Sequence, residues 1–293
     1  MPLAAINKVP LHFEQTGRGQ IPLVLVHGSW VSGTSWANLV PRLAETFHVV
    51  TYDRRGHSRS PMVRGPGSVH DDVADLAALI EFLEIGPACI VGNSFGASIA
   101  LRLAATRPDL VSGIVAHEPS AFALLAEDPS SARLLGVAAR AIAAVVDRIR
   151  RGDAQGAARL FTETVALGAG AWQQLSDTER RILIENAPTF LDEAADPEAL
   201  DLDVDALSQI ACSCLLTRGD QSPPFFAPVV RLLAETVPTA STHVFAGSGH
   251  VPHVTAPEAF ADIVTTFFTQ TAIPAGVGRS SQELMTGARQ HGI

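Results

Sequence analysis

The sequence lacks basic blocks and long apolar runs, and each absence excludes a class of protein. The net charge is −9 and no basic block occurs, so a nucleic-acid partner is not expected. Lys8 is the only lysine because arginine is used in its place. Hydrophobic residues make up 47% of the chain, yet no run approaches the roughly 20 apolar residues that a membrane helix needs. The first ten residues have no long apolar core and do not resemble a signal peptide. We therefore expect a cytoplasmic protein without a membrane partner.

Cysteine is also scarce, with only Cys89, Cys212 and Cys214 in the chain. An odd number of cysteines without a signal peptide indicates free thiols in a reducing compartment. Cys212 and Cys214 alternate along a predicted strand, so both side chains are expected on one face of a sheet. They would make half of a metal site, but no second Cys or His pair has ligand spacing. We interpret them as buried small hydrophobic residues and expect neither a metal nor a cofactor.

Short apolar strands alternate with helical segments over much of the chain. Residues 21–26 form an almost continuous apolar run, as in strands that are buried on both faces of a sheet. The other predicted strands are 9–14, 47–52, 88–91, 111–116, 211–217 and 242–245. The helices predicted between and after them are 36–43, 69–83, 98–103, 227–236 and 257–269. This alternation predicts an α/β fold with a mostly parallel central sheet and helices on both of its faces.

The alternation is interrupted between the strands at 111–116 and 211–217. No strand is predicted there, and the helical runs are 131–150, 153–167 and 176–186. The last run opens with a capping box, Ser176-Asp177-Thr178-Glu179. We interpret this block as an all-helical lid over the carboxyl ends of the strands. The predicted division is a core of residues 1–120 and 206–270, a lid at 121–205 and a C-terminal tail at 271–293.

Residues suited to nucleophilic catalysis follow the predicted strands. The turn Gly92-Asn93-Ser94-Phe95-Gly96 fits G-x-S-x-G, a pattern that places a serine on a strained strand-to-helix turn. A serine hydroxyl needs a base to take its proton and a carboxylate to orient that base. Asp220 and His250 each follow a later strand, at the edge of the sheet where ligands bind. The order serine, acid, histidine is the one given for α/β-hydrolases.

At these residues the chain resembles the α/β-hydrolase superfamily, in its lidded, serine-nucleophile group. The resemblance covers about residues 9–270. It rests on His27-Gly28, Asp53-Arg54-Arg55-Gly56-His57, Gly92-Asn93-Ser94-Phe95-Gly96, Arg218-Gly219-Asp220 and Gly249-His250. It implies Ser94 as nucleophile, His250 as base and Asp220 as orienting acid. It also implies an oxyanion hole made by the backbone N–H groups of Phe95 and Ser29, with Trp30 as the alternative second donor.

Other residues compete for these roles or support them. Glu118 also ends a strand and could reach the histidine from another side in place of the aspartate. His253, three residues beyond His250, is expected to form a wall of the pocket, and the two histidines lack a third ligand for zinc. We expect His27 to brace the oxyanion loop, and residues 53–57 to form a structural loop held by side-chain hydrogen bonds.

The lid and its edges supply aromatic side chains and few charges. The candidate pocket residues are Trp30, Phe122, Phe161, Trp172, Phe190, Phe225, Phe226 and His253. We therefore expect a small-molecule substrate, a small to medium apolar ester, thioester or lactone, cleaved through an acyl-enzyme on Ser94. The same triad could serve a carbon–carbon bond hydrolase or a cofactor-free peroxidase or perhydrolase, and the same fold could form a ligand-binding receptor. No G-x-G-x-x-G follows the first strand, which argues against a dinucleotide enzyme; homo-oligomerisation is left open.

Overall fold

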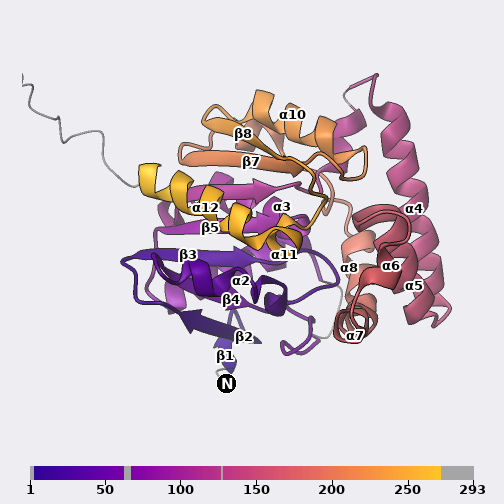
Figure 1. Ribbon diagram of the computed structural model, residues 1–293, viewed down its shortest axis with the longest axis horizontal. Coiled ribbons are helices and arrows are strands. Elements are labelled where there is room, and N and C mark those ends of the chain that lie inside the picture. The colour runs from indigo at the N-terminus through magenta and orange to yellow at the C-terminus, as the bar shows by residue number, and fades with distance from the viewer. Residues whose placement is uncertain (1–2, 63–66, 127, 272–293) are drawn as a thin grey trace, which may run out of the picture.

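A single mixed sheet forms the centre of the computed structural model, which describes residues 3–62, 67–126 and 128–271. Within them the sheet has the order β1-β2-β4-β3-β5-β6-β7-β8 (Figure 1). Its strands are β1 (Leu3–Ile6), β2 (Val9–Thr16), β3 (Ile21–Val26), β4 (Phe47–Tyr52), β5 (Ala88–Asn93), β6 (Val111–His117), β7 (Ser213–Gly219) and β8 (Ala240–Phe245). The pairs β1–β2 and β2–β4 are antiparallel and the others parallel. The predicted α/β fold with a mostly parallel sheet is confirmed.

Helices cover both faces of this sheet because its central strands are apolar on both sides. In β3, Val24 and Val26 belong to one buried cluster and Leu23 and Leu25 to the other, as expected when side chains alternate along a strand. The first cluster packs under α2 (Val69–Phe82), α3 (Phe95–Thr106) and α10 (Phe226–Thr236). The second packs under α1 (Val40–Leu43) and α12 (Pro257–Thr271). The predicted helix at 36–43 is shorter than expected, since residues 33–36 form a 3-10 turn before α1.

Every described residue between β6 and β7 is helical or irregular, and we call residues 118–212 the helical insert. Its helices gather at one end of the sheet (Figure 1). They are η3 (Phe122–Ala126), α4 (Ala132–Arg150), α5 (Ala154–Phe161), η4 (Thr162–Ala166), α6 (Ala171–Gln174), α7 (Asp177–Asn186), η5 (Ala187–Thr189), α8 (Phe190–Ala195) and α9 (Val204–Leu207). The predicted runs fall on α4, α5 with η4, and α7. The division into core, lid and tail stays a prediction, and residues 272–293 of the tail lie outside the described residues.

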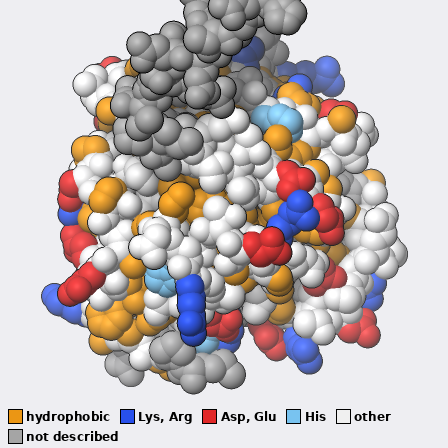
Figure 2. All heavy atoms as spheres, turned by 60° about the vertical axis from the view of Figure 1, so that its left-hand side comes forward, with side chains coloured by type: hydrophobic (Ala, Val, Ile, Leu, Met, Phe, Trp, Pro, Cys, Tyr) orange, Lys and Arg blue, Asp and Glu red, His pale blue; other side chains and the backbone are white. Residues whose placement is uncertain are grey.

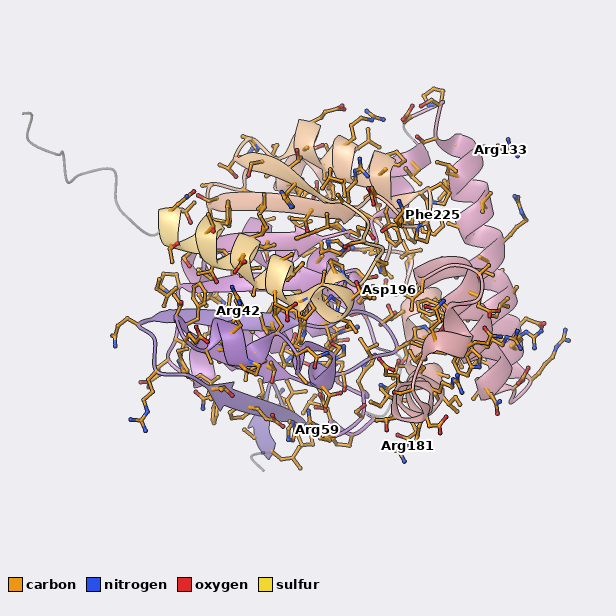
Figure 3. The ribbon with its side chains drawn as sticks, viewed as in Figure 1. Arg42, Arg59, Arg133, Arg181, Asp196 and Phe225 are labelled. Carbon is orange, nitrogen blue, oxygen red and sulfur yellow. The ribbon has the colours of Figure 1, made fainter. Side chains whose placement is uncertain are left out.

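The insert has a small core of its own and is bound to the sheet domain. Val145, Phe161 and Leu183 pack together, and Trp30 from the loop after β3 joins them. Asp196, labelled in Figure 3, follows α8. Its Oδ2 accepts a hydrogen bond from the backbone N–H of Val69 at 2.7 Å. A carboxylate at this place also stabilises the N-terminus of α2. The insert is therefore attached through both apolar packing and polar contacts.

The outer surface has no large region of one charge on the face seen in Figure 2, where acidic and basic side chains are interspersed. Among the described residues, no helix combines the length and the apolar character needed to cross a membrane.

Candidate active site

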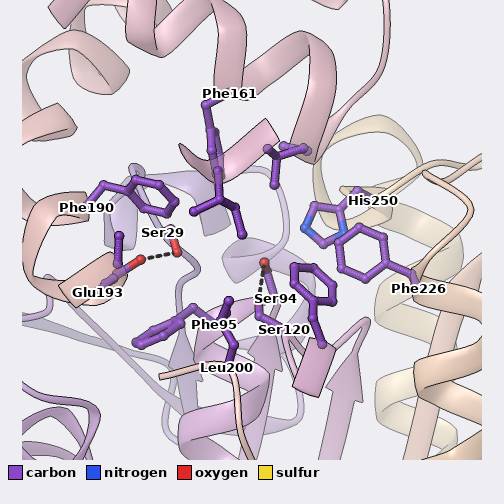
Figure 4. A pocket seen from close by; sticks show the side chains of 15 residues that line it. Ser29, Ser94, Phe95, Ser120, Phe161, Phe190, Glu193, Leu200, Phe226 and His250 are labelled. Atoms are coloured by element: carbon purple, nitrogen blue, oxygen red, sulfur yellow. Dashed lines mark hydrogen bonds between the residues drawn. The ribbon is translucent and has the colours of Figure 1, made fainter. Parts of the chain in front are cut away.

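Ser94 lies on the sharp turn between β5 and α3. Its φ of 55° and ψ of −121° are rare for any residue except glycine, so the turn is strained. The flanking glycines make the turn possible: a Cβ on Gly92 would lie 2.5 Å from the carbonyl oxygen of Gly96, and one on Gly96 would clash with the carbonyl oxygen of Val26. The close packing predicted for G-x-S-x-G is therefore present, and Ser94 faces a cavity (Figure 4).

His250 lies beside the same cavity and is held on three sides. Its Nδ1 is 2.6 Å from Oε2 of Glu118, and its ring stacks on Phe226 at 4.3 Å between centroids. Its carbonyl oxygen accepts a hydrogen bond from Nδ2 of Asn93 at 3.0 Å. Because Nδ1 faces a carboxylate, it carries the proton, which leaves the lone pair of Nε2 to act as a base.

The carboxylate beside His250 belongs to Glu118, which follows β6, and the expected contact with Asp220 is wrong. Asp220 is exposed, and its Oδ1 accepts a hydrogen bond from the backbone N–H of Gly247 at 2.8 Å. Glu118 is fully buried, and its Oε1 accepts the N–H of Gly219 at 2.8 Å. Since β6 and β7 are neighbours in the sheet, both acids end close to the histidine loop, and the glutamate side chain is the one that reaches it.

The pKa of Glu118 reflects this partner. Burial by itself raises the pKa of the carboxyl group, but the hydrogen bond and charge of His250 outweigh it, so the pKa lies below its usual value. His117 contributes in the same direction, with Nε2 3.8 Å from Oε2 of Glu118. Glu118 is therefore ionised at neutral pH, as an orienting carboxylate must be.

His117, Glu118 and His250 are the candidate metal ligands among the described residues, with ligand atoms that all lie within 4.8 Å of one another. Two ligands of one tetrahedral zinc ion would be about 3.3 Å apart, given bonds of about 2.0–2.1 Å. The observed 2.6 Å between His250 and Glu118 is instead a hydrogen-bond distance. His117 bonds Oγ1 of Thr217 through Nδ1 at 2.9 Å, and burial lowers its pKa to about 3. The arrangement is that of an acid–base pair.

The candidate oxyanion donors are backbone N–H groups next to Ser94. Phe95 is the first residue of α3, so its N–H has no partner within the helix. The N–H groups of Ser29 and Trp30 donate to no other residue that the structure describes. Ser29 lines the cavity of Ser94, whereas the side chain of Trp30 is buried in the core of the insert. Phe95 with Ser29 or Trp30 can therefore bind an oxyanion, as the resemblance implies.

The loops around this site are braced as expected. Nε2 of His27 accepts the backbone N–H of Arg54 at 2.9 Å, so Nδ1–H donates to the carbonyl oxygen of Gly28 at 2.8 Å. Burial lowers the pKa of His27 to about 3, so the ring is a neutral brace. Asp53 accepts the N–H of Gly33 at 2.8 Å and binds Arg59. These contacts make residues 53–57 a structural loop.

Ser94 and His250 line two cavities. The smaller, of about 30 Å³, is lined mainly by apolar side chains that include Phe122, Ile142, Val165, Phe190, Leu200 and Phe226. The larger, of about 320 Å³, includes the polar residues Ser32, Ser35, Asn38, Thr178 and His253. Besides Ser94 and His250, three residues line both cavities: Ser29, Phe161 and Ala166. The site therefore has a narrow side and a wider side, and both expose mainly apolar surface.

Part of the predicted pocket lies in these walls and part behind them. Phe122, Phe161, Phe190, Phe226 and His253 line one or both cavities. The prediction is wrong for Trp30, Trp172 and Phe225, which line neither of the two cavities described above. Trp30 stacks on Phe161 at 4.8 Å and Phe225 packs on Phe122 at 4.9 Å, both behind the lining residues, while Trp172 lies under Arg180. Some aromatic residues pack in the core of the insert and others line the cavities. The composition of the insert does not show which residue does which.

Three residues at the site belong to no motif that the sequence shows. Oγ of Ser120 lies 3.1 Å from Oγ of Ser94. Glu193 of α8 accepts a hydrogen bond from Oγ of Ser29, and Asn186 of α7 donates to the carbonyl oxygen of Trp30. Glu193 and Asn186 lie more than 150 positions from these partners, so no local pattern reveals them; Ser120 could have been found only as a neighbour of Glu118.

Comparison with known proteins shows the family to which the chain belongs. The model of the Alpha/beta hydrolase family matches residues 23–263. The chain is 26% identical over 258 residues to the (E)-2-((N-methylformamido)methylene)succinate hydrolase of Acinetobacter baylyi, covering 86% of this chain and 91% of that one. An α/β hydrolase from Sphaerobacter thermophilus superposes with a TM-score of 0.71 at 26% identity, covering 89% of this chain and 96% of that one.

The enol-lactonase from Burkholderia xenovorans has the same fold, with a TM-score of 0.75 at 20% identity over 92% of this chain and all of that one (100%). The family match extends from β3 into α12 and includes Ser94, Glu118 and His250. The chain therefore belongs to the α/β-hydrolase family, and the relatives it matches along its length are hydrolases.

Proposed function

We propose that the protein is a serine hydrolase that cleaves uncharged, mainly apolar esters, thioesters or lactones through an acyl-enzyme on Ser94. The observation that carries this proposal is the buried pair of His250 and Glu118, 2.6 Å apart, beside the cavity that Ser94 faces. Glu118 replaces Asp220 as the orienting acid of the proposed triad. The family match supports a hydrolase, and the residues of the site support the acyl-enzyme chemistry.

In the first half of the reaction, Nε2 of His250 takes the proton of Ser94 as Oγ attacks the carbonyl carbon. The carbonyl oxygen becomes an anion and is bound by the N–H of Phe95 and a second N–H from Ser29 or Trp30. Glu118 holds the tautomer of the imidazole and stabilises the imidazolium that forms. The tetrahedral adduct then collapses, and the alcohol or thiol leaves with the proton from His250.

In the second half, water replaces the leaving group. His250 takes a proton from water, and the hydroxide attacks the acyl carbon of the ester on Ser94. The same N–H groups bind the second oxyanion. The carboxylic acid leaves as Ser94 recovers its proton from His250, so the enzyme is unchanged and one water is consumed.

The charges around the cavities favour an uncharged substrate. Among the described residues that line them there is no Lys or Arg, and the acids are Glu179 and Glu193. The name of the Acinetobacter relative places a succinate in its substrate. A dicarboxylate would meet acidic side chains here without a cation to pair with, which is costly in a partly buried site. We therefore infer that this chain and that relative act on different classes of substrate.

The test is a panel of esters, thioesters, lactones and β-diketones, each with neutral and carboxylated members, against wild type and Ser94→Ala. We expect turnover of neutral carboxylic esters or lactones by the wild type, labelling of Ser94 by a fluorophosphonate, and loss of both in a folded Ser94→Ala. Wild-type hydrolysis by Ser94→Ala would refute the nucleophile. Preference for the carboxylated members would refute the substrate class, and cleavage restricted to diketones would indicate carbon–carbon bond hydrolysis.

A further inference from the structure

The loop of residues 28–31, here called the oxyanion loop, is held by side chains of the helical insert. Trp30 has a positive φ of 70°, which non-glycine residues adopt only when their surroundings impose it. Nδ2 of Asn186 donates to the carbonyl oxygens of Trp30 and Val31 at 3.0 and 3.1 Å. Oγ of Ser29 donates to Oε2 of Glu193 at 2.5 Å (Figure 4). The conformation of the loop thus depends on residues far away in the sequence.

Glu193 is anchored on a buried arginine. Its Oε1 accepts a hydrogen bond from Nη2 of Arg54 at 2.9 Å, and the two side chains are only 9% and 1% exposed. Arg54 is fixed in turn by two hydrogen bonds to Asp72, at 3.1 and 2.8 Å. Its guanidinium also lies over the ring of Phe95, 4.6 Å from the centroid. Arg54 and Glu193 therefore touch both segments that supply the candidate oxyanion donors.

Charge balance does not require Glu193. Asp72 already pairs with Arg54, so Glu193 adds a second carboxylate to one buried guanidinium. Burial raises the pKa of Glu193 above its usual value, although Arg54 opposes the effect. A buried carboxylate in excess of its counter-ion costs stability. Both oxygens of Glu193 are nevertheless engaged, one by Arg54 and one by Ser29, which indicates a geometric role.

We propose that Glu193 is a positioning residue for acyl transfer: through the hydroxyl of Ser29 it holds the backbone N–H of the oxyanion loop toward the developing oxyanion. The inference rests on the proposed function, because an oxyanion forms only when Ser94 attacks a carbonyl group. Glu193 belongs to α8, so the oxyanion hole is complete only while this helix of the insert is docked.

The first experiment measures steady-state kinetics on the best neutral ester. Glu193→Ala and Ser29→Ala each lower kcat by about 10- to 100-fold and change KM by less than about threefold, since a misplaced donor weakens binding of the transition state more than binding of the substrate. Glu193→Gln keeps the shape and one acceptor oxygen, so its loss is smaller. Asp192→Asn is the matched control, because it removes the neighbouring carboxylate of α8, and it leaves kcat unchanged.

A second measurement reports on the oxyanion hole directly. A trifluoromethyl ketone forms a reversible adduct with an active serine, and the oxygen anion of this adduct occupies the hole. The Ki of the ketone therefore rises in proportion to the loss of kcat/KM in the Glu193 and Ser29 variants. The double variant Ser29→Ala/Glu193→Ala loses no more than the worse single variant, because the two side chains act through one hydrogen bond.

Three results would overturn the proposal: unchanged kcat in both alanine variants, a loss confined to KM, or losses that multiply in the double variant. Thermal unfolding checks that each variant is folded, and if Glu193→Ala is not, Glu193→Gln and Ser29→Ala decide by the same criteria. If the proposed function itself is wrong, the wild type neither turns over esters nor binds the ketone. This result differs from the three above, in which the wild type is active.

Discussion

At the scale of single residues, Glu118 shows how one side chain is fixed for its task. One carboxylate oxygen accepts Nδ1–H of His250 and the other the N–H of Gly219. Its backbone has a φ of 46°, a strained value for glutamate. The strain directs the side chain from the end of β6 toward the histidine loop. Asp220, which follows β7, does not have a positive φ. Its carboxylate accepts a hydrogen bond from the backbone N–H of Gly247.

The roles of the two acids can be separated by paired isosteric substitutions. Glu118→Gln should lower kcat by about 10³- to 10⁴-fold, because the amide cannot stabilise the imidazolium and favours the wrong tautomer. Asp220→Asn should keep kcat within about threefold of wild type, since its carboxylate only accepts a hydrogen bond from Gly247. Ester kinetics on both variants make the comparison, and a loss of similar size in Asp220→Asn would contradict the assignment.

At the scale of elements, the π-helical turn η4 divides the space around Ser94. The N–H of Leu167 donates to the carbonyl oxygen of Thr162 at 2.8 Å, a five-residue step that shifts the register of the helix after α5. The turn follows Phe161 directly and contains Ala166, and these two residues line both cavities. Phe161 is kept in place by stacking on Trp30. The partition between the cavities is therefore built by the insert.

Removing the aromatic part of this partition should change acyl-chain selectivity. Phe161→Ala joins the small cavity to the large one, so kcat/KM for long-chain relative to short-chain acyl esters should rise by about tenfold, the size of effect that a few methylene groups produce in an apolar pocket. Leu183→Ala is the control, because Leu183 lines only the larger cavity. A chain-length profile for both variants tests the idea, and parallel profiles would count against the partition.

At the scale of the whole molecule, buried neutral histidines set the response to acid. His27 and His117 are fully buried, and burial lowers the pKa of each from 6.5 to about 3. In the unfolded chain each imidazole takes up a proton near pH 6.5. In the folded protein the same imidazole takes up its proton only near pH 3. Their contribution to stability is therefore complete above pH 6.5 and is lost as pH falls through this window.

Each of these two histidines should lower the free energy of unfolding by about 1.4 kcal/mol per pH unit below pH 6.5. The depressed pKa of Glu118 adds a loss in the same direction below about pH 4.5. Urea unfolding between pH 7.5 and 4.5 measures the effect. A free energy of unfolding that stays constant between pH 6.5 and 5 would be inconsistent with two neutral buried imidazoles.

The parts of this molecule that follow local rules were predictable, and those that depend on distant contacts were not. Apolar runs predict β3 and β5, and G-x-S-x-G predicts the turn at Ser94, because in each case the physical reason lies within a few residues. Which acid meets His250 depends on the reach of side chains from two neighbouring strands. The contact of Glu193 with Ser29 depends on how the insert docks. Neither leaves a periodic trace in the sequence.

The position of Glu118 also affects how such enzymes can be recombined. Glu118, Ser120 and Phe122 are among the first residues after β6, where the sheet domain passes into the helical insert. The acid, a contact of Ser94 and a wall of the cavity thus share one junction of the chain. A chimera that exchanges the insert with that of a relative has to make its upstream cut after Ser120 if it is to keep both the partner of His250 and the contact of Ser94.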